Sequence, residues 1–238
     1  TILHIPKPEK RARIARETLE IYVPLAERIG VTHLQHDLEN DAFAVLHSEM
    51  NQTISNRLEF LAQQSEIVIP MISVELQDVV EQAGIECSVN GRLKTIYSIW
   101  RKMQRKKVTM DQLSDIMAFR VLVPRTDDCY RALGSIHAHY PTVMGRFKDY
   151  ISTPKRNGYQ SLHTGVIGPE SHKIEIQLRT PEMHEIAENG VAAHWDYKNP
   201  ESSKRISKIK WIHELVSILD EEAGADEFLE NTKMDLYH

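Results

Sequence analysis

The sequence predicts an α+β protein in which a mixed β-sheet flanked by helices follows an N-terminal helical segment. Apolar residues recur at helical spacing from residue 8 to residue 83, with almost no glycine among them. After Gly84, short runs rich in β-branched residues alternate irregularly with helical segments. The chain of 238 residues is also longer than the usual domain of about 100 to 200 residues, so we expect one main domain with attached helical parts.

The helical segment is expected over residues 1–83. Its first long helix ends near Pro24, a second follows with apolar residues at helical spacing, and two more segments are expected on either side of Pro70. The main domain is expected over residues 84–200. A C-terminal helical extension is expected over residues 201–238.

The main domain should contain both strands and helices. The stretch before Pro124 is rich in β-branched and aromatic residues, which is typical of a central strand. Pro181 suits the first turn of a helix. The expected order is a strand at 85–91, a helix at 92–106, a strand at 115–124, a helix at 127–140, strands at 161–169 and 172–180, and a helix at 181–198.

Composition argues against a membrane or secreted protein. No apolar run approaches the roughly 18 residues that span a bilayer, and the first residues become charged after a few positions, unlike a secretory signal. They look like the middle of a longer protein. Cys87 and Cys129 are far apart and outside any zinc-ligand spacing, so we expect a cytoplasmic protein without a zinc site.

Positive charge is concentrated in one part of a chain whose formal net charge is −5. Residues 92–107 contain seven Lys or Arg and no acid. If this stretch is helical, Lys94, Ser98 and Lys102 share one side, opposite an apolar side. A solvated surface helix is one interpretation, although such faces usually mix charges of both signs. The other is a site for a phosphate-rich ligand, which the glycine before Arg92 would allow to approach the backbone.

Two carboxylates are expected on strands of the sheet. Alternate residues of a strand face opposite ways, so Glu175 lies on the face opposite to its apolar neighbours. Asp115 stands at the start of the other strongly apolar strand. A strand-end cap or an ion pair would explain either acid alone. Together they could hold a magnesium ion through oxygen ligands, and with the cationic stretch they favour phosphoryl transfer.

Residues 146–164, RFKDYISTPKRNGYQSLHT, gather positive charge around an aromatic ring. Tyr159 follows an Asn-Gly turn and precedes a strand, so its ring either covers the core or stacks on a nucleobase. A lone histidine such as His163 is usually structural. No HExxH, GxSxG or Walker A motif occurs, which argues against a P-loop kinase. If the ring stacks on a base, its phosphates would be within reach of Lys148, Lys155 and Arg156.

Six longer stretches of the sequence carry a family resemblance. In chain order they are GRLKTIYSIWRKM, LSDIMAFRVLV, DCYRALGSIHAHY, GRFKDYISTPKRNGYQSLHT, KIEIQLRTPEMHEIAENGVAAHW and EFLENTKMDLY. They resemble the synthetase domain of the RelA/SpoT family, enzymes that make and degrade guanosine tetra- and pentaphosphate, the alarmones of the bacterial stringent response. The resemblance implies a nucleotidyltransferase-like (polymerase-β-like) sheet that transfers pyrophosphate from ATP to the ribose 3′-OH of GDP or GTP and releases AMP.

Position by position, the resemblance implies a metal site and two nucleotide sites. Asp115 and Glu175 look like the magnesium-binding pair, and Glu175 also like the acceptor of the 3′-OH proton. Tyr159 resembles the residue that stacks on guanine. The residues that resemble the ATP side are Arg92 near the adenine and Lys94, Ser98 and Lys102 near the phosphates. The remaining residues that resemble the GDP/GTP side are Lys148, Lys155, Asn157 and His163.

The resemblance also bears on the parts around the site. RFKD, residues 146–149, resembles the basic version of this segment in bifunctional members, which implies that GDP is favoured as acceptor. Residues 1–83 resemble the end of a hydrolase domain and a connector, but the His-Asp metal motif of that domain does not appear in this sequence. We expect ATP and GDP or GTP as partners and neither DNA nor a membrane; ribosome or regulatory partners would act through other domains. A catalytically silent nucleotide- or RNA-binding regulatory module of the same fold is the alternative, which has no need of the two carboxylates.

Overall fold

The computed structural model describes residues 2–110, 113 and 116–190, which form two compact units. The first unit contains the described residues of 1–46, 156–158 and 185–238, and the second contains those of 47–155 and 159–184. The division into functional domains at residues 84 and 200 stays a prediction. The expected C-terminal extension over 201–238 lies outside the described residues.

Helices form the N-terminal part of the first unit. In chain order they are η1 (Ile2–His4), α1 (Pro8–Glu17), the π-helical turn η2 (Thr18–Tyr22), α2 (Val23–Ile29) and α3 (Thr32–Leu46). Both α1 and α2 pack on α3. The helix α2 ends at Gly30, whose φ of 84° lies in the left-handed region that favours glycine. No helix among the residues described here combines the length and the apolar character needed to cross a bilayer.

The second unit is built around a five-stranded mixed sheet in the order β1-β2-β5-β4-β3. The strands are β1 (Ser88–Leu93), β2 (Met117–Leu122), β3 (Lys148–Asp149), β4 (Leu162–Ile167) and β5 (Lys173–Arg179). β2 and β5 run parallel, and all other neighbours are antiparallel. The predicted α+β fold with a mixed sheet is confirmed, while the short strand β3 has no counterpart in the sequence-based prediction.

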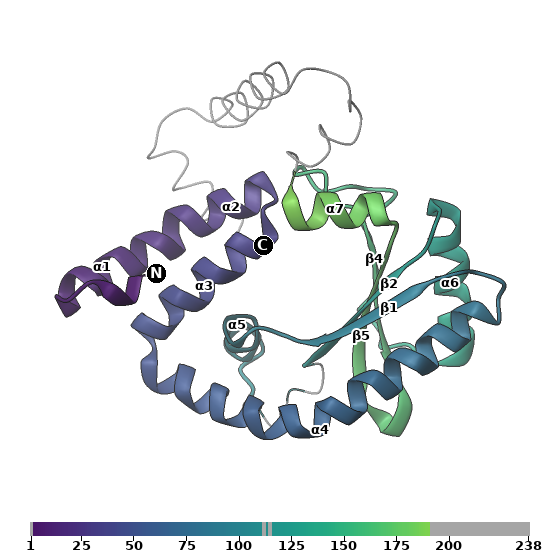
Figure 1. Ribbon diagram of the computed structural model, residues 1–238, viewed down its shortest axis with the longest axis horizontal. Coiled ribbons are helices and arrows are strands. Elements are labelled where there is room, and N and C mark those ends of the chain that lie inside the picture. The colour runs from purple at the N-terminus through teal and green to yellow at the C-terminus, as the bar shows by residue number, and fades with distance from the viewer. Residues whose placement is uncertain (1, 111–112, 114–115, 191–238) are drawn as a thin grey trace, which may run out of the picture. The chain divides into compact units, whose positions relative to one another are not determined.

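One face of the sheet is covered by α4 (Ser48–Glu81) and α6 (Thr126–His139), which border the strands in Figure 1. The other helices are α5 (Ile96–Lys106), the 3-10 turn η4 (Pro169–Ser171) and α7 (Pro181–Asn189), of which residues 181–184 belong to this unit and residues 185–189 to the first. In β5 the apolar residues alternate with half-buried polar ones, so a single face of the strand enters the core. The fully buried core residues include Ile72, Leu76, Val80, Phe119, Val121, Ile136, Leu162, Ile176 and Leu178.

The helix α4 continues through Pro70, whereas the sequence predicts two segments there. A proline inside a helix removes one backbone N–H and costs about 3 kcal/mol. The turns that follow bury Ile72, Leu76 and Val80 completely in the core. Burying each such side chain contributes about 1.5 to 3 kcal/mol, so packing on the sheet outweighs the proline.

Gly91 lies inside β1 and not at the start of a helix, which corrects the sequence-based prediction. A Cβ atom at this position would lie 2.6 Å from Cγ2 of Ile69 in α4 and 2.6 Å from the ring of Phe119 in β2. Real Cβ atoms do not approach other atoms so closely. The glycine is therefore needed for the packing of α4 against the sheet, while its expected role in admitting a ligand stays a prediction.

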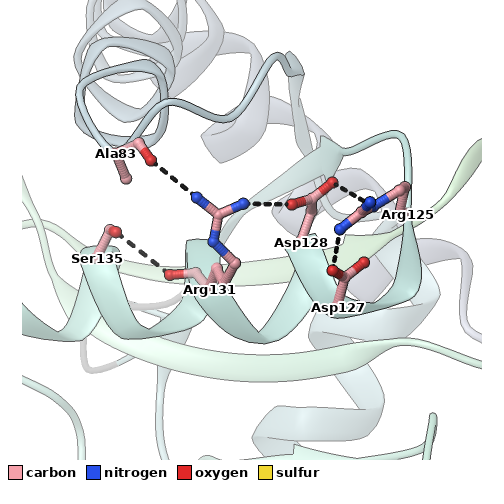
Figure 2. Close-up of polar contacts among 6 residues, drawn as sticks. All are labelled: Ala83, Arg125, Asp127, Asp128, Arg131 and Ser135. Atoms are coloured by element: carbon pink, nitrogen blue, oxygen red, sulfur yellow. Dashed lines mark hydrogen bonds and ion pairs between the residues drawn. The ribbon is translucent and has the colours of Figure 1, made fainter.

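Figure 2 shows polar contacts that join α6 to the chain just after α4. Arg131 Nη1 donates to Asp128 Oδ1 at 2.8 Å, and Arg131 Nη2 donates to the Ala83 carbonyl at 3.2 Å. Arg125 pairs with Asp127 and also lies 3.6 Å from Asp128. Arg131 thus joins α6 to the chain segment that follows α4, so we assign this cluster a structural role.

Candidate active site

The face of the sheet opposite to α4 and α6 carries polar side chains. Residues directly opposite each other in neighbouring strands point to the same face. Glu175 of β5 lies opposite Ala118 of β2 and Gly165 of β4, and Arg92 of β1 also lies opposite Ala118. Four predicted site residues from four strands therefore share this face: Arg92 in β1, Glu175 in β5, His163 in β4 and Lys148 in β3.

Glu175 forms an ion pair with Lys94, in which Lys94 Nζ lies 2.7 Å from Glu175 Oε2. The Lys94 side chain is 14% exposed and the Glu175 side chain 29%. Burial alone would raise the pKa of Glu175, but the charge and hydrogen bond of Lys94 outweigh it, and Lys102 adds to the effect, so the pKa is lowered. Glu175 is therefore an ionised carboxylate at neutral pH, next to at least two cations.

The predicted ATP-side residues come from three elements and not from one helix. The helix α5 begins only after the N-cap Thr95, whose hydroxyl oxygen accepts a hydrogen bond from the Ser98 amide at 3.4 Å. Arg92 lies in β1, and Lys94 lies in the connection between β1 and α5. The prediction of a helix from Arg92 onward is therefore wrong, because pairing with β2 extends the strand past this residue. Ser98 and Lys102 do lie one turn apart on α5.

Tyr159 belongs to a cluster of three rings with Tyr150 and His163. The Tyr159 centroid lies 5.7 Å from that of His163 and 5.9 Å from that of Tyr150, and the Tyr150 and His163 centroids are 5.2 Å apart. All three pairs are edge-to-face, with interplanar angles of 74°, 83° and 85°. Lys155 Nζ lies 5.3 Å from the centroids of both tyrosine rings. Tyr159 is half-buried and is not among the residues of the apolar core cluster, and both interpretations of its ring stay predictions.

Tyr159 and His163 are both uncharged at neutral pH. Burial lowers the pKa of His163 to about 4, with Glu175 opposing this shift and Lys155 adding to it. Burial also raises the pKa of the Tyr159 phenol. The Tyr159 hydroxyl and His163 Nε2 lie 2.6 Å apart, so a neutral phenol and a neutral imidazole share this hydrogen bond. His163 offers a hydrogen-bonding ring nitrogen and not a positive charge.

The loop after β3 is held by Asp149, the last residue of RFKD. Asp149 Oδ1 accepts hydrogen bonds from the backbone amides of Ile151 and Ser152, each at 2.9 Å. This is the local pattern of an Asx turn. Tyr130 of α6 also donates its hydroxyl to Asp149 Oδ2 at 3.1 Å. These hydrogen bonds therefore fix the conformation of the chain where the loop that leads to Tyr159 begins.

The structure does not test the expected roles of two predicted site residues. Asp115 lies outside the described residues. Asn157 belongs to the first unit, where its side-chain amide donates to the Glu27 carbonyl at 2.9 Å. The next residue, Gly158, has a φ of 76°, as the Asn-Gly turn predicts. The roles of Asp115 and Asn157 stay predictions.

Two arginines that the sequence-based site did not include lie on the same face. Arg120 of β2 is in register with Gln177 of β5, and Arg179 at the end of β5 is only 1% exposed. Burial raises the pKa of Tyr159, but Arg179 and Arg120 act in the opposite direction, so both charges lie near the phenol. Strand alternation already predicts Arg179 on the Glu175 face, and the same alternation applied to the strand before Pro124 identifies Arg120.

The described residues include one of the two expected magnesium ligands, Glu175, and no group of three or more His, Cys, Asp or Glu among them could hold a metal ion, so the magnesium site stays a prediction. This ion prefers oxygen ligands and is usually held by one or two carboxylates together with substrate phosphates. Glu175 supplies an ionised carboxylate on the polar face, from a rigid strand. An ion bound there would compete with Lys94 for Oε2, the oxygen that Lys94 contacts.

Comparisons with known proteins identify relatives along nearly the whole chain. A family model described as "Region found in RelA / SpoT proteins" matches residues 91–202. The GTP pyrophosphokinase rsh of Brucella ovis is 43% identical over 242 residues, which cover 99% of this chain and 32% of the relative. The bifunctional (p)ppGpp synthase/hydrolase SpoT of Escherichia coli K12 is 42% identical over 234 residues, covering 97% of this chain and 33% of that protein. The chain thus spans about a third of the length of the curated relatives it matches.

A solved structure also matches part of the chain. It is the small alarmone synthetase 1 from Bacillus subtilis bound to its product pppGpp, with 22% sequence identity and a TM-score of 0.46, covering 77% of this chain and 100% of that one. The family assignment depends on the sequence matches alone. The family model covers all but the first residues of the sheet, and the identity extends through the N-terminal helices. Together these matches show that the chain belongs to the RelA/SpoT family.

Proposed function

We propose that the chain carries the synthetase activity of a GTP pyrophosphokinase, which transfers a pyrophosphoryl group from ATP to the 3′-OH of GDP or GTP and releases AMP. The observation that carries this proposal is the ionised Glu175, paired with Lys94 on the polar face that also bears His163. Relatives named GTP pyrophosphokinase and (p)ppGpp synthase/hydrolase support it. The product would be the stringent-response alarmone, made in the cytoplasm.

The transfer forms one bond and breaks another. The ribose 3′-oxygen attacks the β-phosphorus of ATP, and the bond from that phosphorus to the α,β-bridging oxygen breaks, so AMP leaves with the bridging oxygen. The 3′-OH proton passes to the Glu175 carboxylate. A magnesium ion, when held by Glu175 and Asp115, would supply charge neutralisation and orientation of the phosphates.

Lys94 connects the two substrates in this scheme. While Lys94 pairs with Glu175, it keeps the pKa of the carboxylate low and so makes it a weak proton acceptor. A triphosphate competes for the same ammonium, because phosphates form strong charge-assisted hydrogen bonds. ATP binding would then free the Glu175 carboxylate for the acceptor hydroxyl and the metal. The other proposed ATP-side contacts are Arg92, Ser98 and Lys102.

The acceptor nucleotide is proposed to bind beside β4. Tyr159 would stack on the guanine, which is worth about 1 to 3 kcal/mol for a base on an aromatic ring. His163 would act as a neutral hydrogen-bonding partner, in keeping with its low pKa. Lys148, Lys155 and Asn157 complete the proposed set. The RFKD segment is proposed to favour GDP over GTP.

An assay of the purified chain tests the proposal. The chain is incubated with ATP, magnesium and either GDP or GTP, and the nucleotides are separated by anion-exchange chromatography. We expect AMP and a 3′-pyrophosphorylated guanosine nucleotide in equal amounts, formed faster with GDP than with GTP. Neither product should form with EDTA, and Glu175→Gln should form both far more slowly. Nucleotide binding without either product, across magnesium concentrations and pH, would instead identify the silent nucleotide-binding module.

A further inference from the structure

We propose that Tyr150 is a positioning residue of the acceptor site, which fixes the Tyr159 ring and keeps the Lys155 ammonium beside it. The inference rests on the proposed function, because Tyr159 and Lys155 matter here as contacts of a guanine nucleotide. Tyr150 itself is not proposed to touch the nucleotide. It follows RFKD directly in the sequence, where no motif or charge pattern singles it out.

The Tyr150 ring contacts both other rings of the cluster. It meets Tyr159 at 5.9 Å and 74°, and His163 at 5.2 Å and 83°. Edge-to-face pairs of this kind are favourable beyond the area that they bury. Tyr159 is therefore held twice, at its hydroxyl by His163 and at its ring by Tyr150. A ring that is already fixed loses less freedom when a base stacks on it.

The same ring helps to hold Lys155. Lys155 Nζ lies 5.3 Å from the Tyr150 centroid and 5.3 Å from the Tyr159 centroid, although the lysine is otherwise exposed. A contact between an exposed cation and an aromatic ring is weak, whereas a contact with a phosphate is a strong charge-assisted hydrogen bond. The ammonium is thus kept next to the stacking ring but can move to a phosphate when a nucleotide arrives.

Tyr150 can orient these groups because its own backbone is anchored. Its amide donates to the Ser161 carbonyl at 3.0 Å, which ties the loop to the start of β4. The turn capped by Asp149 fixes the chain immediately before it. At the other end of the loop, the Lys155 amide donates to the Tyr159 carbonyl at 3.2 Å. A positioning residue must itself be fixed by its surroundings, and Tyr150 meets this condition.

The test compares Tyr150→Leu, which removes the ring, with Tyr150→Phe, which keeps the ring and removes only the hydroxyl. For each variant we would measure KM for GDP at saturating ATP, KM for ATP at saturating GDP, GDP binding by calorimetry without ATP, and the melting temperature. Because ring pairs and cation–π contacts are individually weak, Tyr150→Leu should raise both KM for GDP and the dissociation constant of GDP by only about 5- to 30-fold. KM for ATP in Tyr150→Leu should stay within about twofold of the wild-type value. In Tyr150→Phe, both KM values and the dissociation constant of GDP should do the same.

Several results would overturn the inference while leaving the proposed function intact. These are unchanged GDP constants in Tyr150→Leu, equal losses for GDP and ATP together with a lower melting temperature, or a loss in Tyr150→Phe as large as in Tyr150→Leu. In a Lys155→Met background, the effect of Tyr150→Leu should shrink, and full additivity would refute the role of the ring in holding Lys155. A wild-type chain that neither binds GDP nor forms product would refute the proposed function, and the inference with it.

Discussion

Replacing Glu175 with Gln should destabilise the protein as well as inactivate it, because Glu175 is the ion-pair partner of a mostly buried ammonium. Lys94 Nζ and Glu175 Oε2 are 2.7 Å apart, and the two side chains are 14% and 29% exposed. Either single substitution, Glu175→Gln or Lys94→Met, leaves the opposite charge in place. The double variant leaves neither charge, so much of the lost stability should return.

The burial of the pair sets the magnitude. Removing one partner of a fully buried ion pair costs about 3 to 5 kcal/mol, and an exposed pair contributes about 0 to 1 kcal/mol. For side chains that keep some contact with water, we expect about 1 to 3 kcal/mol for each single variant. In a chain of this size, 1 kcal/mol corresponds to roughly 2 to 4 °C in melting temperature. Each single variant should therefore melt about 2 to 12 °C below the wild type.

Two measurements on the same four proteins separate stability from catalysis. Thermal melts of the wild type, Glu175→Gln, Lys94→Met and the double variant give the coupling energy of the pair, expected to be about 1 to 3 kcal/mol. Chromatographic assays give turnover, which should fall about 10²- to 10⁴-fold in Glu175→Gln if the carboxylate takes the 3′-OH proton. The double variant should recover stability without recovering turnover.

The melts decide whether the ion pair stabilises the fold. If the loss in the double variant equals the sum of the two single losses, the residues do not couple and the reasoning from burial is refuted. If Glu175→Gln keeps wild-type turnover, the carboxylate is structural and its catalytic role is refuted instead.

Three further predictions concern the fold around the site. The pKa of an unfolded histidine is near 6.5, whereas His163 has a pKa of about 4 in the fold. Between these pH values the unfolded chain binds more protons, so the free energy of unfolding should fall by up to about 3 kcal/mol as the pH drops from about 6.5 to about 4. Denaturant titrations of His163→Gln should show a smaller fall, and the same dependence of stability on pH as in the wild type would contradict the prediction. Gly91→Ala should lower the free energy of unfolding by about 1 to 3 kcal/mol, because its Cβ would collide with side chains of α4 and β2. Gly134→Ala in α6, where a Cβ would have nothing within 4 Å, should raise the free energy of unfolding by about 0.5 to 1 kcal/mol. Equal melting temperatures of the two variants would count against the packing argument. Arg131→Met should lower the unfolding free energy by about 1 to 2 kcal/mol, since it removes the hydrogen bond to Ala83 just after α4. Arg125→Met, at a side chain 67% exposed, should change the unfolding free energy much less. A larger loss in the second variant would refute the structural role assigned to Arg131.

The strands and the faces of the sheet follow from local patterns in the sequence. Alternation of apolar and polar residues in KIEIQLR places Glu175 on the face away from the core, and the structure confirms this. The strand expected before Pro124 and the two expected on either side of the turn at Gly168 fall where strands form. These features could be predicted because a strand has a period of two residues, and burial of one face depends on the strand's own side chains.

The start of α5 and the role of Gly91 could not be found in this way. Apolar and basic residues after Gly91 fit a helical period, yet the first of them pair with β2 as a strand. Pro70 likewise marks a break that does not occur. In each case a long-range contact outweighs a local preference: the packing of α4 on the sheet and the pairing of β1 with β2 both join residues distant in the sequence.

In the site, too, some features follow from the sequence and others depend on long-range contacts. Residue types and their order identify the charged groups, and a family resemblance gives them expected roles. The ion pair between Lys94 and Glu175 joins residues 81 positions apart, and it forms because β2 lies between β1 and β5 in the sheet. The low pKa of His163 and the setting of Tyr150 likewise depend on burial and neighbours from several elements. No local pattern encodes strand order, because that order minimises the free energy of the whole core and not of any single segment.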